Sequence, residues 1–600
     1  MLIYRLSKSP HPEINHSVVI DENFCINVYI GNKKVSHLGE YKIPACATDI
    51  NDVELLIDKL RQIDVEKQAD ACSAIALIRI VISLLSVIQD ESFKHSSTLK
   101  FICEQLHLMT LSKIQYSTEL FIFSSLFYNC SPPGYRLLRE KRFLILPSYN
   151  TIRRIFSSGN FGPESEQLES NFLMYIKNKF KALLPEDKNV TLMVDEIHIK
   201  PCFDYKGGNI VGSAFDTSEA ASSAYVFMVG SIMSKFKDVV HIIPAKKMKA
   251  EVLHNILKKI IIGLEKIGFS VVCVVTDNNA INGKAMSLFA NPPQLSIVYV
   301  NPADRCRPLF FLFDSVHLLK CIRNNWINQK DIEKTMRFPN YCPYGVNFSE
   351  NPEISHAPFS TLRKLFFLES NSLLKHAYKL SHKAIYPSNL ERQNVKLAQQ
   401  IFNDYIVQSL LTLGEKHSLH LFADVANYIN IFHKWWTIMN VQTPFKGIYT
   451  KNTYATPMTG DISDEKNTFL ESFLDWLEIW GNIDGTGGKL SRETFTALKH
   501  TTHGIIEITK YCISELKMKY VLTGKFQTDK LESRFGQYRQ LSGGNYNISI
   551  RQIFECEKKL RIMSLLQKKK LPFHDQKVVL KDFHTNWDDM DVLWSSVASW

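Results

Sequence analysis

The stretch Val190-Thr-Leu-Met-Val-Asp195-Glu-Ile-His-Ile199 decides the fold class of this chain. Its period-two alternation and its β-branched residues predict a β-strand that carries an acidic side chain. A second stretch, Phe269-Ser-Val-Val-Cys-Val-Val-Thr-Asp277, is apolar almost to its last residue, which is typical of a strand at the centre of a sheet covered on both faces. Each predicted strand therefore carries one aspartate, Asp195 on the first strand and Asp277 on the second.

The residues between these two strands predict the rest of an α/β core. Apolar residues recur at helical spacing over residues 251–268, and the final glycine supplies the stop. Further strands are predicted at 224–233 and 238–243. Strand, two more strands, helix and strand is the order of an RNase H-like core, in which Asp195 and Asp277 lie on adjacent central strands.

Paired carboxylates on neighbouring strands indicate a metal site. Like charges held close together repel and raise each other's pKa, and a divalent cation removes that penalty. Mg²⁺ prefers hard oxygen ligands, and two such ions about 4 Å apart stabilise both the attacking and the leaving oxygen of a phosphoryl displacement. The alternative is that Asp195 and Asp277 only end their strands as turn or cap residues. For either residue alone that alternative is the better interpretation.

A third acid lies in the motif Lys525-Phe-Gln-Thr-Asp-Lys-Leu-Glu532-Ser-Arg-Phe-Gly-Gln-Tyr-Arg-Gln-Leu-Ser-Gly-Gly-Asn545. A helix that carries Glu532 before Phe-Gly, an arginine and Gly-Gly-Asn resembles the glutamate-bearing helix of cut-and-paste DDE transposases. More narrowly, the chain resembles the P element transposase and its THAP-domain relatives over residues 95–565. Three further blocks occur in the order of that family: Asp277-Asn-Asn-Ala-Ile-Asn282, Phe313-Asp314-Ser-Val-His317-Leu-Leu-Lys320-Cys-Ile-Arg323-Asn324-Asn325 and Leu390-Glu-Arg-Gln-Asn-Val395.

The resemblance implies a DDE DNA transposase that performs DNA cleavage and strand transfer. Asp195, Asp277 and Glu532 would be its catalytic residues and would bind two Mg²⁺ ions, for which Mn²⁺ can substitute. The implied partner is double-stranded DNA, as transposon ends and as target, and a homo-oligomer in the nucleus is expected. Two alternatives stay open. One is a domesticated DNA-binding or scaffold protein that keeps the fold without transposing, and the other is an RNase H-like nuclease.

The segment between Asp277 and Glu532 is longer than an uninterrupted core requires, which predicts an inserted domain. Residues 335–520 are interpreted as an all-α insertion, with helices at 390–413, 419–439, 467–480 and 491–511. In the family this insertion binds GTP without hydrolysing it, although no Gly-x-x-x-x-Gly-Lys-Ser/Thr loop occurs here. The resemblance implies a guanine contact for Asp529 and a phosphate contact for Lys320. A helix-cap acid and a lysine that offsets a helix dipole are the alternatives.

Residues 91–160 are predicted to form a helix-turn-helix DNA-binding module. Helices are expected at 99–108 and 113–128, the Ser-Pro-Pro-Gly at 131–134 is expected to break the chain, and Ser148 or Asn150 is expected to cap a short helix. That helix carries Arg153 and Arg154, which are candidate phosphate contacts, and Arg539 is a third DNA-binding candidate. A solvated basic helix in a packing module is the alternative.

Residues 1–90 carry no assignment, and residues 576–600 are interpreted as a tail. The family normally begins with a zinc-coordinating THAP finger, whereas Cys25 and Cys46 are isolated in sequence and the twelve cysteines show no paired spacing. We therefore expect a chain that has lost its finger or is a fragment. The catalytic domain is expected in two parts, 175–334 and 521–575.

Composition is compatible with this interpretation. The chain has 600 residues, of which 45% are hydrophobic and 22% charged, as in folded proteins of several domains. The net charge of +11 favours a polyanionic partner, although a basic surface can also serve solubility. The longest apolar stretch, 74–88, is shorter than the ~20 residues of a membrane helix. It is interpreted as a buried helix, and no membrane partner is expected.

Overall fold

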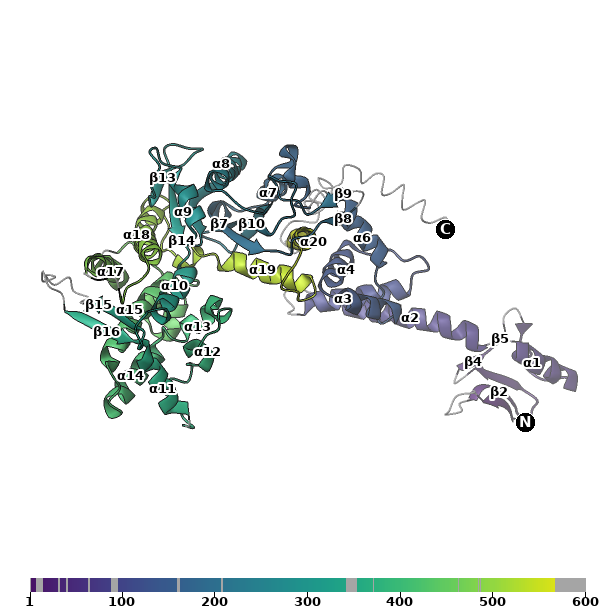
Figure 1. The fold of residues 1–600 in the computed structure, drawn as a ribbon. Helices are drawn as coiled ribbons and strands as arrows, with labels where there is room; N and C mark the ends of the chain where they lie inside the picture. Colours follow the sequence, from purple (N-terminus) through teal and green to yellow (C-terminus); the bar gives the residue numbers. More distant parts are fainter. Residues whose placement is uncertain are drawn as a thin grey trace. The chain divides into compact units, whose positions relative to one another are not determined.

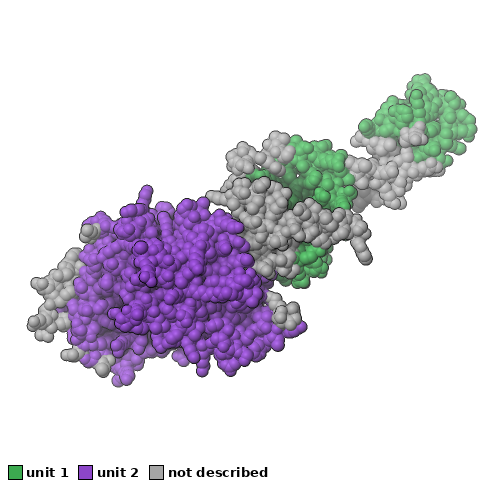
Figure 2. Space-filling model, turned by 90° about the horizontal axis from the view of Figure 1, so that it is seen from above, with its two compact units in different colours: residues 1–155 green, residues 156–600 purple. Residues whose placement is uncertain are grey.

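The computed structural model describes residues 2–6, 14–30, 33–38, 41–62, 65–87, 95–158, 162–206, 209–341, 353–370, 372–461, 463–483, 485 and 487–566. The chain forms two compact units, residues 1–155 and 156–600, which Figure 2 distinguishes by colour. The predicted tail at 576–600 lies outside the described residues. Within the described part of the chain, no helix combines the length and the hydropathy that a membrane crossing requires.

The first unit begins with a small antiparallel sheet and a helix, neither of which was predicted. Buried side chains such as Val18, Val28 and Leu56 join the sheet to the helix. The Cys25 and Cys46 sulfurs lie 3.4 Å apart, so two cysteines that are isolated in sequence are neighbours in space. The elements are β1 (Leu2–Leu6), β2 (Ile14–Ile20), β3 (Ile26–Ile30), β4 (Lys33–Val35), β5 (His37–Leu38), β6 (Tyr41–Lys42) and α1 (Ile50–Gln62).

Helices follow in the described residues of the first unit, and the last of them extends past residue 155. They are α2 (Val65–Val87), α3 (Ser96–Met109), α4 (Thr118–Cys130), α5 (Pro132–Glu140) and α6 (Tyr149–Ser158). The interpretation of 74–88 as a buried helix is wrong, because Leu77 is 59% exposed and Leu84 is 64% exposed. The Ser-Pro-Pro-Gly segment does more than break the chain, since Ser131 caps α5 and the prolines occupy its first turn, where no backbone donor is needed.

The second unit is built on a six-stranded sheet with the strand order β11-β10-β7-β12-β14-β13. Strands β7, β10 and β11 pair antiparallel, whereas β12 runs parallel to both β7 and β14. The strands and helix predicted from the sequence are all present. They are β7 (Asn189–His198), β10 (Ser223–Ser231), β11 (Lys237–Ala245), α8 (Ala250–Ile267) and β12 (Ser270–Thr276), to which β13 (Val298–Val300) and β14 (Pro308–Phe313) add.

Strand β7 presents different residues to the two faces of this sheet. Val190, Leu192 and Val194 pack into the core cluster that contains the buried side of α8. Met193 and Ile197 pack on the opposite face against the helices α19 (Asp529–Leu541) and α20 (Ile550–Leu566). Figure 1 shows α8 and α19 on opposite sides of the sheet. Because side chains alternate along a strand, Asp195 belongs to the face that α19 covers.

A mostly helical insertion separates β14 from α19. Its helices are α10 (Ser315–Ile327), which opens it, α11 (Phe359–Ser370), α12 (His382–Ile385), α13 (Val395–Gln399), α14 (Asp404–Lys416), α15 (Phe422–Met439), α16 (Lys446–Thr450), α17 (Glu465–Asn482) and α18 (Arg492–Ser514). The insertion is not all-α, since β15 (Thr335–Pro339) and β16 (Ile354–Pro358) form a hairpin. The single helix predicted at 390–413 is also wrong, because Asn394 and Asn403 each cap a new helix.

The insertion is joined to the core sheet along β14. The Phe313 amide donates to the Thr501 hydroxyl over 3.1 Å, and that hydroxyl donates to the Phe313 carbonyl over 3.0 Å. His500 of α18 bonds the Phe311 carbonyl at 2.9 Å. The elements of the insertion are therefore held directly against the strand that precedes α10.

A buried ionic network fixes α19 and α20 to the sheet. Arg561 contacts Glu166 at 2.8 Å and Glu557 at 3.2 Å, and Arg534 contacts Asp238 at 3.1 Å. All these groups are almost fully shielded from solvent, so removing one partner would leave a buried charge uncompensated, at a cost of about 3–5 kcal/mol. Arg534 lies two residues after Glu532, so the network holds this part of α19 against β11.

Candidate active site

Asp195 and Asp277 lie at the same end of the central strands. In the parallel pair β7 and β12, Val194 is the register partner of Thr276, so the residues that follow, Asp195 and Asp277, are adjacent. This register confirms the prediction that Asp195 and Asp277 follow adjacent positions on neighbouring strands. Both side chains are partly buried.

Burial is the largest cause of the raised pKa of both carboxyl groups in this pair. Burial, followed by the charge of Asp277, raises the pKa of Asp195 to about 8, although the Glu196 amide donates to its Oδ1 over 2.7 Å. Glu532 and Asp314 also contribute to that rise. Burial raises the pKa of Asp277 as well, and the side-chain amide of Asn282, which donates to it, works against the rise.

Glu532 lies in the first turn of α19, on the face of the sheet to which Asp195 belongs. Its amide donates to the Thr528 carbonyl over 3.0 Å, and its side chain is 46% exposed. The Lys320 ammonium approaches its Oε1 at 3.8 Å. The structure therefore brings the third acid of the motif into electrostatic range of the first, across an insertion that separates them widely in sequence.

Asp314 is a fourth acid at this site, to which sequence reasoning gave no role. It is buried between β14 and α10, where it caps α10 by accepting from the Val316 and His317 amides, both over 3.2 Å. It also accepts from the Thr528 hydroxyl over 2.8 Å. Burial raises its pKa to about 6, although the Thr528 hydrogen bond acts to lower it. The signal in the sequence was its position directly after an apolar strand, the same position that drew attention to Asp277.

Two residues adjoin the first two acids of the site. Asn279 caps α9 (Ala280–Ser287), so Asn282 is not the cap and is instead a hydrogen-bond partner of Asp277. Glu196 accepts from the Tyr225 hydroxyl over 3.2 Å, on the face opposite to Asp195. Although Glu196 lies on the other face, its charge still acts to raise the pKa of Asp277.

The nucleotide-binding candidates lie at the junction between core and insertion. Asp529 accepts from the side-chain amide of Gln442, which belongs to the insertion, over 3.3 Å. Burial, followed by the charge of Glu532, raises the pKa of Asp529, while Gln442 and Lys320 lower it. Asp529 and Lys320 are therefore neighbours of Glu532, and a nucleotide contact stays a prediction for both.

The three arginine candidates are not equivalent. Arg153 and Arg154 are exposed on α6 in the first unit, but the Arg153 Nε donates to the Tyr128 hydroxyl over 2.7 Å. Arg539 lies on α19 in the second unit, with its guanidinium 4.5 Å from the centre of the Tyr546 ring. DNA contacts stay a prediction for all three.

Ser148 accepts from the amide of Thr151 at the start of α6, as expected of a cap.

The donor set has the chemistry of a divalent-cation site. Among the residues that the structure describes, no three His, Cys, Asp or Glu side chains are placed so that they could hold one metal ion between them. Asp195 and Asp277 nevertheless are adjacent, partly buried carboxylates, and hard oxygen ligands of this kind fit Mg²⁺. The three-acid metal site stays a prediction.

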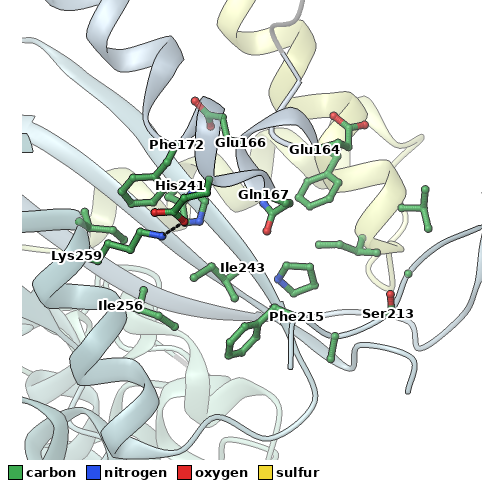
Figure 3. A pocket seen from close by; sticks show the side chains of 18 of the residues that line it. Glu164, Glu166, Gln167, Phe172, Ser213, Phe215, His241, Ile243, Ile256 and Lys259 are labelled. Carbon is green, nitrogen blue, oxygen red and sulfur yellow. Dashed lines mark hydrogen bonds and ion pairs between the residues drawn. The ribbon is translucent and has the colours of Figure 1, made fainter. Parts of the chain in front are cut away.

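A cavity of about 590 Å³ lies elsewhere, at the β11 edge of the sheet (Figure 3). Its walls include Phe172 and Phe215, together with His241 of β11 and Ile256 of α8. None of the four acids described above lines it.

Comparison with known proteins defines the class of this fold. Residues 165–290 match the family model described as TNP-like, RNase H N-terminal domain. The second unit therefore contains an RNase H-like domain of the transposase type, as predicted.

Within that class the chain is similar to the P element transposase. The Transposable element P transposase of Drosophila melanogaster is 23% identical over 362 residues, which are 60% of this chain. Those residues are 43% of that protein, so the chain spans less than half of its length. The solved structure of the Drosophila P element transposase strand transfer complex matches with a TM-score of 0.61 at 19% identity, covering 80% of this chain and 98% of that chain. The resemblance predicted from the sequence motifs is confirmed.

Proposed function

We propose that this protein is a P element-like DDE transposase that cleaves DNA and transfers the freed strand to a target. The observation that supports this most directly is the meeting of Asp195 and Asp277 on parallel strands, with Glu532 coupled to Asp195 from a helix beyond the insertion. A packing role alone does not require acidic side chains here, because their repulsion destabilises the fold. A reaction on phosphodiesters supplies the reason for keeping them.

Asp195, Asp277 and Glu532 would hold two Mg²⁺ ions, or Mn²⁺ in their place. Ions bound there would activate the attacking oxygen and stabilise the leaving oxygen of an in-line displacement. The chain's own groups prepare the site: Asn282 orients the Asp277 carboxylate, and Asp314 ties the start of α19 to the end of β14. Because Asp195 has a pKa of about 8 without a cation, cation binding near neutral pH is expected to release a proton.

Double-stranded DNA is the proposed partner, in the nucleus. Residues 91–160 are proposed to act as a helix-turn-helix module, with Arg153 and Arg154 on α6 and Arg539 on α19 as phosphate contacts. A homo-oligomer is proposed as the working form. The exposed apolar residues Leu77 and Leu84, one heptad apart on α2, support it, since an exposed seam of this kind favours helix pairing.

The insertion is proposed to bind GTP, which is not hydrolysed. Asp529 supports this proposal, because it is a partly buried acid whose hydrogen-bond partner, Gln442, comes from the insertion. A carboxylate in such a position can accept from the N1 and exocyclic amine groups of guanine, which adenine does not offer in the same arrangement. Lys320 is the proposed phosphate contact.

A DNA-binding protein without catalysis is the second candidate. The approach of Lys320 to Glu532 at 3.8 Å favours it, because the lysine offers this carboxylate a cation other than a metal ion. Asp195 and Asp277 would then be retained from a catalytic ancestor without taking part in a reaction. An RNase H-like nuclease would keep the acids and cut DNA without joining it.

The test replaces each acid by its amide and measures cleavage and binding separately. Asp195→Asn, Asp277→Asn and Glu532→Gln should each abolish Mg²⁺- or Mn²⁺-dependent cutting of a plasmid that carries the flanking sequences of the gene, with DNA binding retained. Asp216→Asn, at an exposed aspartate remote from the acids in sequence, is the matched control and should cut like the wild type. Equal cutting by all five proteins, or none by any, would overturn the catalytic proposal.

A further inference from the structure

Four lysines gather where the turn between β10 and β11 meets the start of α19. This lysine cluster consists of Lys235, Lys237, Lys525 and Lys530. Lys525 donates to the Ser234 carbonyl of the turn. Lys530 reaches under α19 to the sheet, because a Cβ placed on Gly230 would lie 3.1 Å from its ammonium nitrogen. Lys235 and Lys237 are exposed and form the rim of the cluster.

None of these four lysines forms a salt bridge with an acidic side chain among the residues that the structure describes. The Lys530 ammonium is fully shielded from solvent and has no hydrogen-bond partner in that part of the chain. Burial, followed by the charges of Lys525 and Lys237, lowers the pKa of Lys530 to about 7. Burial, together with Lys235 and Lys237, also lowers the pKa of Lys525.

The nearby acids are already engaged. Asp238 accepts from Lys179 and Arg534, and Glu557 lies between Arg534 and Arg561. Asp187 accepts from the Ser234 hydroxyl. An ammonium that is buried without a partner destabilises the fold or loses its proton. An anion bound at the exposed rim would offset this positive charge without touching the shielded Lys530 ammonium, and lysine binds phosphate well as a point charge.

The cluster and the catalytic acids share one face of the sheet. Gly230 pairs with Thr191 in the register of β10 and β7, four residues before Asp195 on β7. At about 3.3 Å per residue this separation is about 13 Å. A DNA duplex covers that length in about four base pairs. A single duplex could therefore reach both places.

We propose that the lysine cluster binds a backbone phosphate of double-stranded DNA, within about four base pairs of the phosphodiester at Asp195 and Asp277. The inference rests on the proposed function, since it takes DNA as the partner. A Cβ at Gly230 would lie 2.9 Å from the Met193 methyl carbon and 3.1 Å from the Lys530 ammonium nitrogen, so both side chains would shift if this residue were larger.

The experiment measures duplex binding by the full chain as a function of salt, in EDTA so that no cleavage occurs. Each phosphate contact contributes about 0.9 to the slope of log K against log salt concentration. Lys237→Gln combined with Lys525→Gln should lower that slope by about 1. Lys258→Gln, at an exposed lysine on α8 across the sheet, should leave it unchanged.

Thermal unfolding in inorganic phosphate separates a DNA site from a site for the free anion. The inference is overturned if the double variant has the same salt-dependence slope as the wild type, whether or not phosphate stabilises the wild type. It is also overturned if the protein does not bind the duplex at low salt. A lowered slope in a protein that never cuts DNA would leave the phosphate site standing while the catalytic proposal fails. The inference is supported if the double variant has a lower slope than the wild type while Lys258→Gln has the wild-type slope.

Discussion

Breaking the hydrogen bond between Thr528 and Asp314 should loosen the start of α19 and lower activity without touching any of the three acids. Asp314 is buried and accepts from the Thr528 hydroxyl over 2.8 Å, while it also caps α10. A hydrogen bond to a charged group contributes about 1.5–3 kcal/mol, and a helix cap about 1 kcal/mol. Thr528→Val removes only the first contribution, whereas Asp314→Ala removes both, about 3 kcal/mol together.

Hydrogen exchange in peptides that cover residues 526–541 measures this loss locally. Every 1.4 kcal/mol is a factor of ten, so exchange should accelerate about tenfold in Thr528→Val and about 100-fold in Asp314→Ala. Cleavage should fall and should need more Mg²⁺, because Glu532 is then held less firmly. Thr528→Ser restores the donor and should restore both exchange and activity.

The reasoning is wrong if Thr528→Val leaves exchange in this helix unchanged, or if Thr528→Ser fails to rescue a defect that Thr528→Val causes. A loss of thermal stability across the whole second unit, without faster exchange at α19, would indicate general packing damage. Asp314 would then not be a positioning residue for Glu532.

Three further predictions address other parts of the structure. The pKa of Asp195 is raised in the folded state, from its usual value near 3.8 to about 8, so between these values the folded state binds a proton that the unfolded state has lost. Thermal stability in EDTA should therefore fall as pH rises from 4 to 8. Asp195→Asn should flatten this dependence of thermal stability on pH. Labelled GTP should bind more tightly than ATP, and Asp529→Ala should weaken GTP binding with an unchanged fold by circular dichroism; equal affinities would remove the nucleotide proposal. Leu77→Lys with Leu84→Lys should convert an oligomer into a monomer in light scattering, and an unchanged mass would exclude α2 from the interface.

The core of the fold was predictable because its signals are local. The alternation along 190–199 and the apolar run at 269–277 each specify a strand by themselves, and Gly268 ends α8 with a φ of +115°, which favours glycine. The adjacency of Asp195 and Asp277 then follows from strand order. Glu532 required the longer motif, because its place at the site depends on a helix far away in sequence.

What could not be predicted depends on contacts distant in the chain. The partner of Asp314 is Thr528, on the far side of the insertion, and no periodicity records that pairing. The exposure of α2 was misjudged because an apolar sequence does not say whether anything packs on it. Cys25 and Cys46 meet through the fold of the N-terminal sheet and helix, which cysteine spacing did not indicate.

Strand transfer tests the central claim most directly. A duplex with free 3′-hydroxyl ends, taken from the sequences that flank the gene, would be incubated with a supercoiled target plasmid and Mg²⁺ or Mn²⁺. The account predicts joined products with the wild type and none with Asp195→Asn, Asp277→Asn or Glu532→Gln, or in EDTA. Joined products that persist in the Glu532→Gln protein, or that form without a divalent cation, would contradict it.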